Sequence, residues 1–212
     1  MNDLNKAIGD ISSIRMQVAR STEFRGYGPA TLAATGLFAV AAGTAQALWL
    51  ADPASHVPVY LAIWISTAMV SAALIGTQMR ARTQRVHSGL ANEMIFMAVE
   101  QFLPSVAAGA LLTFVLARYV PVAVWMLPGL WQLIFSLGIF SSCRFLPRPM
   151  LAAGAWYLAT GIVCIALAGN RALSPWAMIV PYGAGQFLVA GILFFTTREA
   201  DGEADGEAED EK

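Results

Sequence analysis

One carboxylate stands out, because Glu100 lies inside an apolar stretch long enough to cross a membrane, residues 94–117. By helical rise from residue 94 it lies about 9 Å below the cytoplasmic end of that span. A carboxylate there must be paired, hydrated or protonated, because the membrane interior strongly disfavours an isolated charge. Two interpretations stay open. Glu100 forms an ion pair with Arg80 or Arg144 at the membrane rim, or it carries protons or receives a cationic substrate group.

Polar side chains of the neighbouring apolar stretches fall at a similar predicted depth. Amides and hydroxyls at this depth either bridge helices by hydrogen bonds or line a cavity that opens to the cytoplasm. The candidate intramembrane polar site comprises Glu100, Gln101, Gln132, Ser136 and Gln186, with Ser71 and Thr35 in the same half of the membrane.

Several common membrane chemistries lack their essential residues in this chain. The only lysines are Lys6 and Lys212, so no helix offers a retinal attachment site. His56 and His87 fall in loops on opposite sides, which disfavours haem or zinc binding. Phosphate-binding glycine loops, His-Glu-x-x-His, Cys-x-x-Cys and serine elbows are also missing from the sequence. We therefore predict no catalytic residue, metal or cofactor, and no nucleic-acid partner; enzymatic activity is left open but not favoured.

These polar residues are carried by stretches that are too apolar for an ordinary soluble domain. Of the 212 residues, 57% are hydrophobic and 13% are charged. About 20 apolar residues in a helix cross the hydrocarbon core, and none of the stretches shows the alternation of a barrel strand. Six qualify, at 27–50, 57–79, 94–117, 121–143, 149–168 and 174–197. The predicted fold class is all-α: a polytopic membrane protein with a bundle of six transmembrane helices and a short N-terminal amphipathic helix.

The orientation of the chain in the membrane can be predicted from its arginines and lysines, because short cytoplasmic loops carry an excess of these residues. One side of the predicted bundle has only Arg118 and Arg171. The other side has Lys6, Arg15, Arg20, Arg25, Arg80, Arg82, Arg85, Arg144, Arg148, Arg198 and Lys212. Both termini are therefore predicted to be cytoplasmic.

Anionic lipid headgroups are candidate ligands of Arg80, Arg82, Arg85, Arg144 and Arg148, although the positive-inside rule alone accounts for these residues.

The regions flanking the bundle differ in composition. Residues 1–25 place apolar side chains on one face of an amphipathic helix, which lies on the headgroups or self-associates into a homodimer. Residues 26–198 form the transmembrane domain. Residues 199–212 contain eight of the fourteen acidic residues and are predicted to be disordered.

Small residues repeat every fourth position in the first span, at Thr31, Thr35, Ala39, Gly43 and Ala47, which favours close packing within the bundle or a dimer contact.

Three prolines interrupt the predicted spans: Pro104, Pro128 and Pro181. Each removes a backbone donor and frees the carbonyl group four residues earlier. The freed carbonyls, on Glu100, Val124 and Ala177, must each find another donor inside the membrane.

Several segments resemble a family of uncharacterised bacterial six-helix inner-membrane proteins. They are residues 24–27 (FRGY), 100–104 (EQFLP), 125–131 (WMLPGLW), 135–138 (FSLG), 173–178 (LSPWAM) and 185–186 (GQ). The resemblance covers most of residues 20–197 and implies a bacterial inner-membrane location, but no established activity. We expect a non-enzymatic bundle that binds a small ligand or a partner protein and has a regulatory role. The alternative is a small-molecule or proton-coupled transporter that uses Glu100.

Overall fold

The computed structural model describes residues 28–85, 89–143, 148–167 and 169–210. The predicted amphipathic helix at 1–25, its homodimer and Arg144 lie outside these ranges. Every regular element of the described ranges is helical. The six long helices are α2 (Pro29–Trp49), α3 (Val57–Arg85), α4 (Gly89–Tyr119), α5 (Leu127–Ser142), α6 (Met150–Ala166) and α8 (Gly185–Asp210).

Five helical stretches are long and apolar enough to cross a membrane: Pro29–Trp49, Val57–Ala81, Glu100–Tyr119, Pro121–Ser142 and Trp176–Thr196. The sixth, α6, is apolar but has 17 residues, or about 25 Å of helical rise. The predicted all-α architecture with five to six helices of spanning length is confirmed. The observed bounds follow the apolar stretches of the sequence closely.

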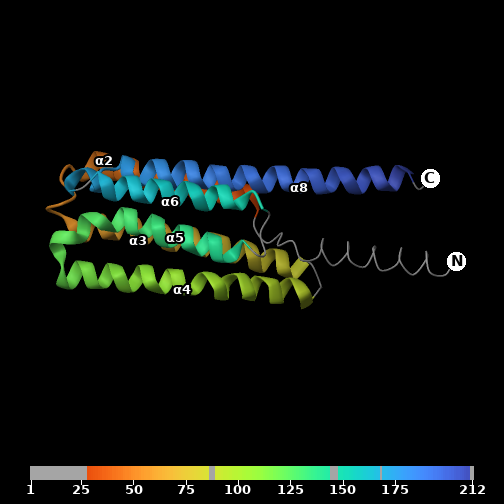
Figure 1. Ribbon diagram of the computed structural model, residues 1–212, viewed down its shortest axis with the longest axis horizontal. Coiled ribbons are helices and arrows are strands. Elements are labelled where there is room, and N and C mark those ends of the chain that lie inside the picture. Colours follow the sequence, from red (N-terminus) through yellow and green to blue (C-terminus); the bar gives the residue numbers. More distant parts are fainter. Residues whose placement is uncertain (1–27, 86–88, 144–147, 168, 211–212) are drawn as a thin grey trace.

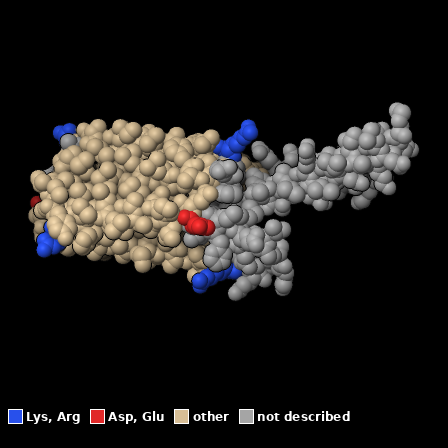
Figure 2. Space-filling view, turned by 60° about the horizontal axis from the view of Figure 1, so that its bottom comes forward, with Lys and Arg blue, Asp and Glu red and all other residues tan. Residues whose placement is uncertain are grey.

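The long helices lie side by side along the long axis of the molecule (Figure 1). α5 packs most extensively against α6 and α4, and α2 packs against α8 and α3. α3 and α4 are the least enclosed, since 11% and 6% of their apolar windows are buried, against 33 to 44% in the other three. The flank of the body is therefore uncharged and apolar. In Figure 2 the basic side chains lie at its two ends, and an acidic group lies near one of them.

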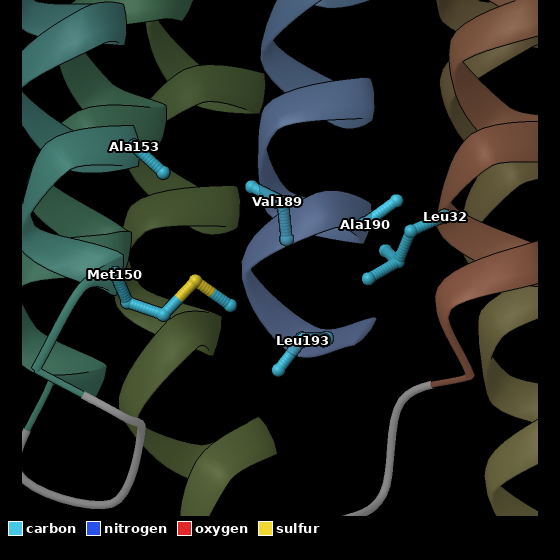
Figure 3. Close-up of a cluster of buried hydrophobic side chains, with 6 residues drawn as sticks. All are labelled: Leu32, Met150, Ala153, Val189, Ala190 and Leu193. Atoms are coloured by element: carbon cyan, nitrogen blue, oxygen red, sulfur yellow. The ribbon is translucent and has the colours of Figure 1, made fainter. Parts of the chain in front are cut away.

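Two clusters of buried side chains join helices that are distant in the sequence. In the first, Val189, Ala190 and Leu193 of α8 lie between α6 and α2 (Figure 3). Their partners are Met150 and Ala153 of α6 and Leu32 of α2. The second cluster links α2 and α3 to the segment before α8, through Ala39, Leu50, Tyr60, Trp64, Leu173 and Met178.

The middle of the small-residue stripe of the first span faces the interior of the same chain, whereas Ala47 at its end is exposed. Thr35, Ala39 and Gly43 are buried, and a Cβ at Gly43 would collide with Ile179. α2 packs there against η3, a π-helix over Ile179–Ala184, and against α8. This is the packing within the bundle that the stripe favours.

The structure changes the prediction for Pro128. This proline lies in the first turn of α5, after a 3₁₀ segment (η1, Pro121–Met126), and not in the interior of a helix. A proline there removes a donor that a helix start leaves unpaired anyway. The backbone N–H of Leu127 donates to the Val124 carbonyl, so that carbonyl is not left free. Pro104 does lie inside α4, and Pro181 lies inside η3.

The last helix extends beyond the predicted transmembrane domain. α8 continues through Asp210, whereas the sequence predicts disorder from residue 199 onward. Alanine and glutamate are good helix formers, and a segment that continues an existing helix needs no new nucleus.

Candidate functional site

Gln132 is the centre of the candidate site. It is fully buried on α5, and its Nε2 donates to the carbonyl oxygen of Ala177 at 2.9 Å. That carbonyl is the group that Pro181 frees, as the sequence predicts. A carbonyl only accepts, so the amide nitrogen must face Ala177 and the amide oxygen must point away from it. The Oε1 of Gln132 is buried and has no hydrogen-bond partner within the described part of the chain.

The irregular segment beside Gln132 is held from two sides. α7 (Trp176–Met178) is followed by η3, the π-helix that contains Pro181. Trp156 of α6 donates from Nε1 to the Pro181 carbonyl at 3.0 Å, while Gln132 holds Ala177 from α5. The break in the last span is thus held by one side chain from α5 and one from α6. Short π-helical segments occur frequently at functional sites.

Tyr157 and Gln186 lie next to this break. Tyr157 of α6 is fully buried, and a Cβ at Gly185 would lie 2.5 Å from its hydroxyl oxygen. The hydroxyl is therefore directed at the backbone of α8 immediately before Gln186. The Gln186 side chain lies within interaction range of the Tyr157 hydroxyl, although neither that hydroxyl nor Gln186 Oε1 reaches the geometry of a hydrogen bond with a described residue. Unpaired polar atoms are rare inside proteins, because each forfeits about 1–3 kcal/mol of solvation.

Three aromatic rings, from α5, α6 and η3, pack on one another beside this break. The centroids of Phe135 and Tyr157 are 4.8 Å apart, those of Tyr157 and Tyr182 are 5.5 Å apart, and those of Phe135 and Tyr182 are 5.9 Å apart. The rings pack edge to face or tilted on one another, a preferred aromatic geometry. We call the group formed by Gln132, Tyr157, Gln186, Phe135 and Tyr182 the inner site.

The remaining residues of the predicted polar site have different surroundings. Ser136 lies one turn from Gln132 and donates from Oγ to the Gly154 carbonyl of α6 at 2.8 Å, so its hydroxyl is used in helix packing. Gln101 of α4 is half-buried, and its Oε1 has no hydrogen-bond partner within the described ranges. Its neighbour Phe102 packs against Phe135, with ring centroids 5.4 Å apart.

Glu100 does not belong to the inner site, because its side chain is exposed. α4 begins at Gly89, so Glu100 lies eleven residues, about 16 Å by helical rise, into the helix. Its depth below the cytoplasmic end of the span stays a prediction. Within the described ranges Glu100 forms no ion pair; Arg80 is also exposed.

The structure describes two of the five arginines that are predicted to bind lipid headgroups. Arg80 and Arg148 have exposed side chains, at the end of α3 and just before α6. The side chains of Arg82 and Arg85, like the whole of Arg144, lie outside what the structure describes.

Sequence reasoning missed Tyr157 and Tyr182, whose hydroxyl groups are hidden in apolar stretches. It also missed Gln46, which is fully buried and joins three parts of the chain. Gln46 accepts from Trp64 Nε1 of α3 at 2.8 Å and donates from Nε2 to the Leu173 carbonyl at 2.8 Å. A glutamine inside an apolar stretch was the available signal for this contact.

Fold and site together define an all-helical bundle with helices of membrane-spanning length and an internal polar site. No protein-family model, curated protein or solved structure matches the chain. The function must therefore be inferred from the inner site itself.

Proposed function

We propose that this chain is a multi-pass protein of the bacterial inner membrane, with both termini in the cytoplasm and the lipid bilayer around its flank. The lengths of the helices and the uncharged flank support this proposal. Arg118 and Arg171 fall at one end, whereas Arg80, Arg148 and Arg198 fall at the other. The end richer in arginine is the cytoplasmic one by the positive-inside rule.

Within this frame, the bundle acts as a non-enzymatic, regulatory binding protein that takes a small polar ligand between α5, α6 and α8. The observation that carries the proposal is a set of buried polar atoms that lack a well-formed hydrogen bond to the described residues, Gln132 Oε1, Tyr157 OH and Gln186 Oε1. A ligand that bonds to these atoms recovers their lost solvation and thereby gains affinity. The transporter alternative is not retained, because exposed Glu100 is not part of the inner site.

The test is ligand-dependent stability of the detergent-solubilised protein. Size-fractionated polar metabolites are added, and the melting temperature of the wild type is compared with that of Gln186→Met, which removes the amide but keeps a similar shape. At a ligand concentration about 100 times Kd the wild type should gain about 2.7 kcal/mol, a rise of a few degrees. Gln186→Met should show no rise.

Thr44→Val is the matched control, because its exposed hydroxyl bonds only to Val40 within α2. It should respond to the active fraction as the wild type does. The proposal is wrong if no fraction raises the melting temperature of the wild type while Gln186→Met alone makes the protein more stable. That result would assign the amide to packing.

A further inference from the structure

We propose that Trp49, Tyr119 and Trp176 form an aromatic girdle that lies in the headgroup layer of the outer leaflet of the membrane. The partner that this surface fits is the phosphate and carbonyl region of phospholipids. The inference rests on the membrane location within the proposed function, and it adds the level at which the outer membrane surface crosses the bundle.

Exposed tryptophan and tyrosine rings occur at one end of the described part of the chain. Trp49 is 82% exposed, Trp176 is 69% exposed and Tyr119 is 67% exposed, whereas the other described tryptophans and tyrosines are buried or half-buried. Each exposed ring is the terminal residue of an apolar span: two spans end at Trp49 and Tyr119, and the last span begins at Trp176. Rings with an apolar body and one polar group are favoured where hydrocarbon meets water.

Contacts between helices place the three rings at about the same level. Gln46, which lies three residues before Trp49, donates to the Leu173 carbonyl. Leu173 in turn lies three residues before Trp176. Tyr119 ends α4 just before η1, and η1 packs against η2, which ends at Leu173. Three residues of helix rise about 4.5 Å, which is less than the interfacial layer of about 5–7 Å on each side of the hydrocarbon core.

The rings are distributed around the bundle and do not gather on one face. α2, which ends at Trp49, and α4, which ends at Tyr119, lie at opposite edges of the bundle (Figure 1). A protein partner binds a contiguous exposed patch, whereas the headgroup layer contacts a membrane protein on all sides. The distribution therefore favours lipid over a second copy of the chain or a periplasmic protein.

Arginine side chains add charge that complements the phosphates. Arg118 is exposed beside Tyr119, and its guanidinium carbon lies 5.6 Å from the centre of that ring. Guanidinium groups at the edge of an apolar surface reach toward the headgroups and bind phosphate well. The opposite end has exposed Arg80, Arg148 and Arg198, and the described residues there include no exposed tryptophan or tyrosine. The two membrane surfaces are therefore contacted by different side chains.

The girdle also fixes the depth of the break in the last span. A Cβ at Gly43 would collide with Ile179, the first residue of η3. Gly43 lies six residues before Trp49, or about 9 Å below it along α2. Since half of the hydrocarbon core is about 15 Å thick, the π-helical segment begins in the outer leaflet.

Quenching of tryptophan fluorescence by brominated lipids tests the girdle with the full chain in phospholipid vesicles. Lipids brominated close to the headgroup should quench the wild type several-fold more than lipids brominated near the ends of the acyl chains. This difference should be largely lost in the double variant Trp49→Phe and Trp176→Phe, whose exposed positions tolerate the change. Adding Tyr119→Trp to the double variant should restore it. Trp64→Phe is the matched control, because Trp64 is buried, and it should keep the difference.

Equal or stronger quenching by the deeply brominated lipids would place the rings in the hydrocarbon and overturn the inference. Absence of quenching by both lipids would overturn it as well. In that case quenching by iodide would place the rings in water, and protection from iodide would show that a protein partner or a second copy covers them.

This inference and the proposed function fail separately. If cysteine labelling shows that the helices cross the membrane but the shallow lipids do not quench the exposed tryptophans, the girdle is wrong and the membrane location stands. If the helices do not cross the membrane, the membrane location is wrong and the girdle falls with it. Stabilisation by a metabolite fraction tests ligand binding independently of the rings.

Discussion

Replacing Gly129 by alanine is expected to lower the free energy of unfolding by about 1–3 kcal/mol, the cost typical of overpacking a close contact. A Cβ at this position would lie 2.7 Å from the Gly161 carbonyl oxygen and 2.6 Å from Cγ1 of Ile165. Gly161 approaches equally closely in return, since its Cβ would lie 2.9 Å from the Gly129 carbonyl. The obstruction is backbone on both sides, so relief requires α5 and α6 to move apart.

The sign of this effect distinguishes packing from helix propensity. Alanine is favoured over glycine inside a helix by about 1 kcal/mol, so propensity alone predicts a gain. Gly76→Ala in α3 is the matched control, because no atom lies within 4 Å of its added Cβ. It should be neutral or stabilising in detergent unfolding monitored by circular dichroism. Equal losses for Gly129→Ala and Gly76→Ala would contradict the close contact between α5 and α6.

Replacing Gln46 by methionine is expected to cost about 2–4 kcal/mol, because it leaves two buried groups without partners. Trp64 Nε1 loses its acceptor and the Leu173 carbonyl loses its donor, while the side-chain volume stays similar. The contact joins α2, α3 and the end of η2 (Gly169–Leu173), so its loss should also loosen the end of the bundle that carries Arg171.

The comparison variant for this network is Trp64→Phe, which removes the donor to Gln46 but leaves the bond to Leu173 intact. Trp64→Phe also removes volume from a buried position, so a double-mutant cycle is needed to isolate the hydrogen bond between the two side chains. A coupling energy near zero, together with wild-type stability of Gln46→Met, would show that this network does not hold the three elements together.

Much of the fold follows from apolar length and arginine placement. The stretches at 27–50, 57–79 and 121–143 correspond closely to the observed windows Pro29–Trp49, Val57–Ala81 and Pro121–Ser142. These predictions succeed because the hydrocarbon thickness fixes the required length. The start of α4 at Gly89 was not predicted, because composition does not show where a helix begins and the apolar stretch starts only at residue 94.

The candidate site was predictable in part. Pro181 indicated that the Ala177 carbonyl needs a donor, and Gln132 was recognised as a buried polar residue, but only packing shows that one serves the other. Tyr157 was missed because its ring makes it indistinguishable from an apolar residue in a hydropathy pattern. The opposite error affected Pro128, since a proline inside an apolar stretch predicts a kink even where a new helix starts.

The proposed function requires the helices to cross the membrane, and cysteine accessibility in intact bacterial cells measures this crossing directly. In a background with Cys143 and Cys164 replaced by serine, single cysteines are introduced as Ala54→Cys, Val122→Cys, Arg85→Cys and Arg148→Cys. A membrane-impermeant maleimide should label the first two in intact cells and the last two only after lysis. Labelling of Arg85→Cys in intact cells, or recovery of the full chain as a soluble monomer without detergent, would show that the helices do not cross the membrane in this way.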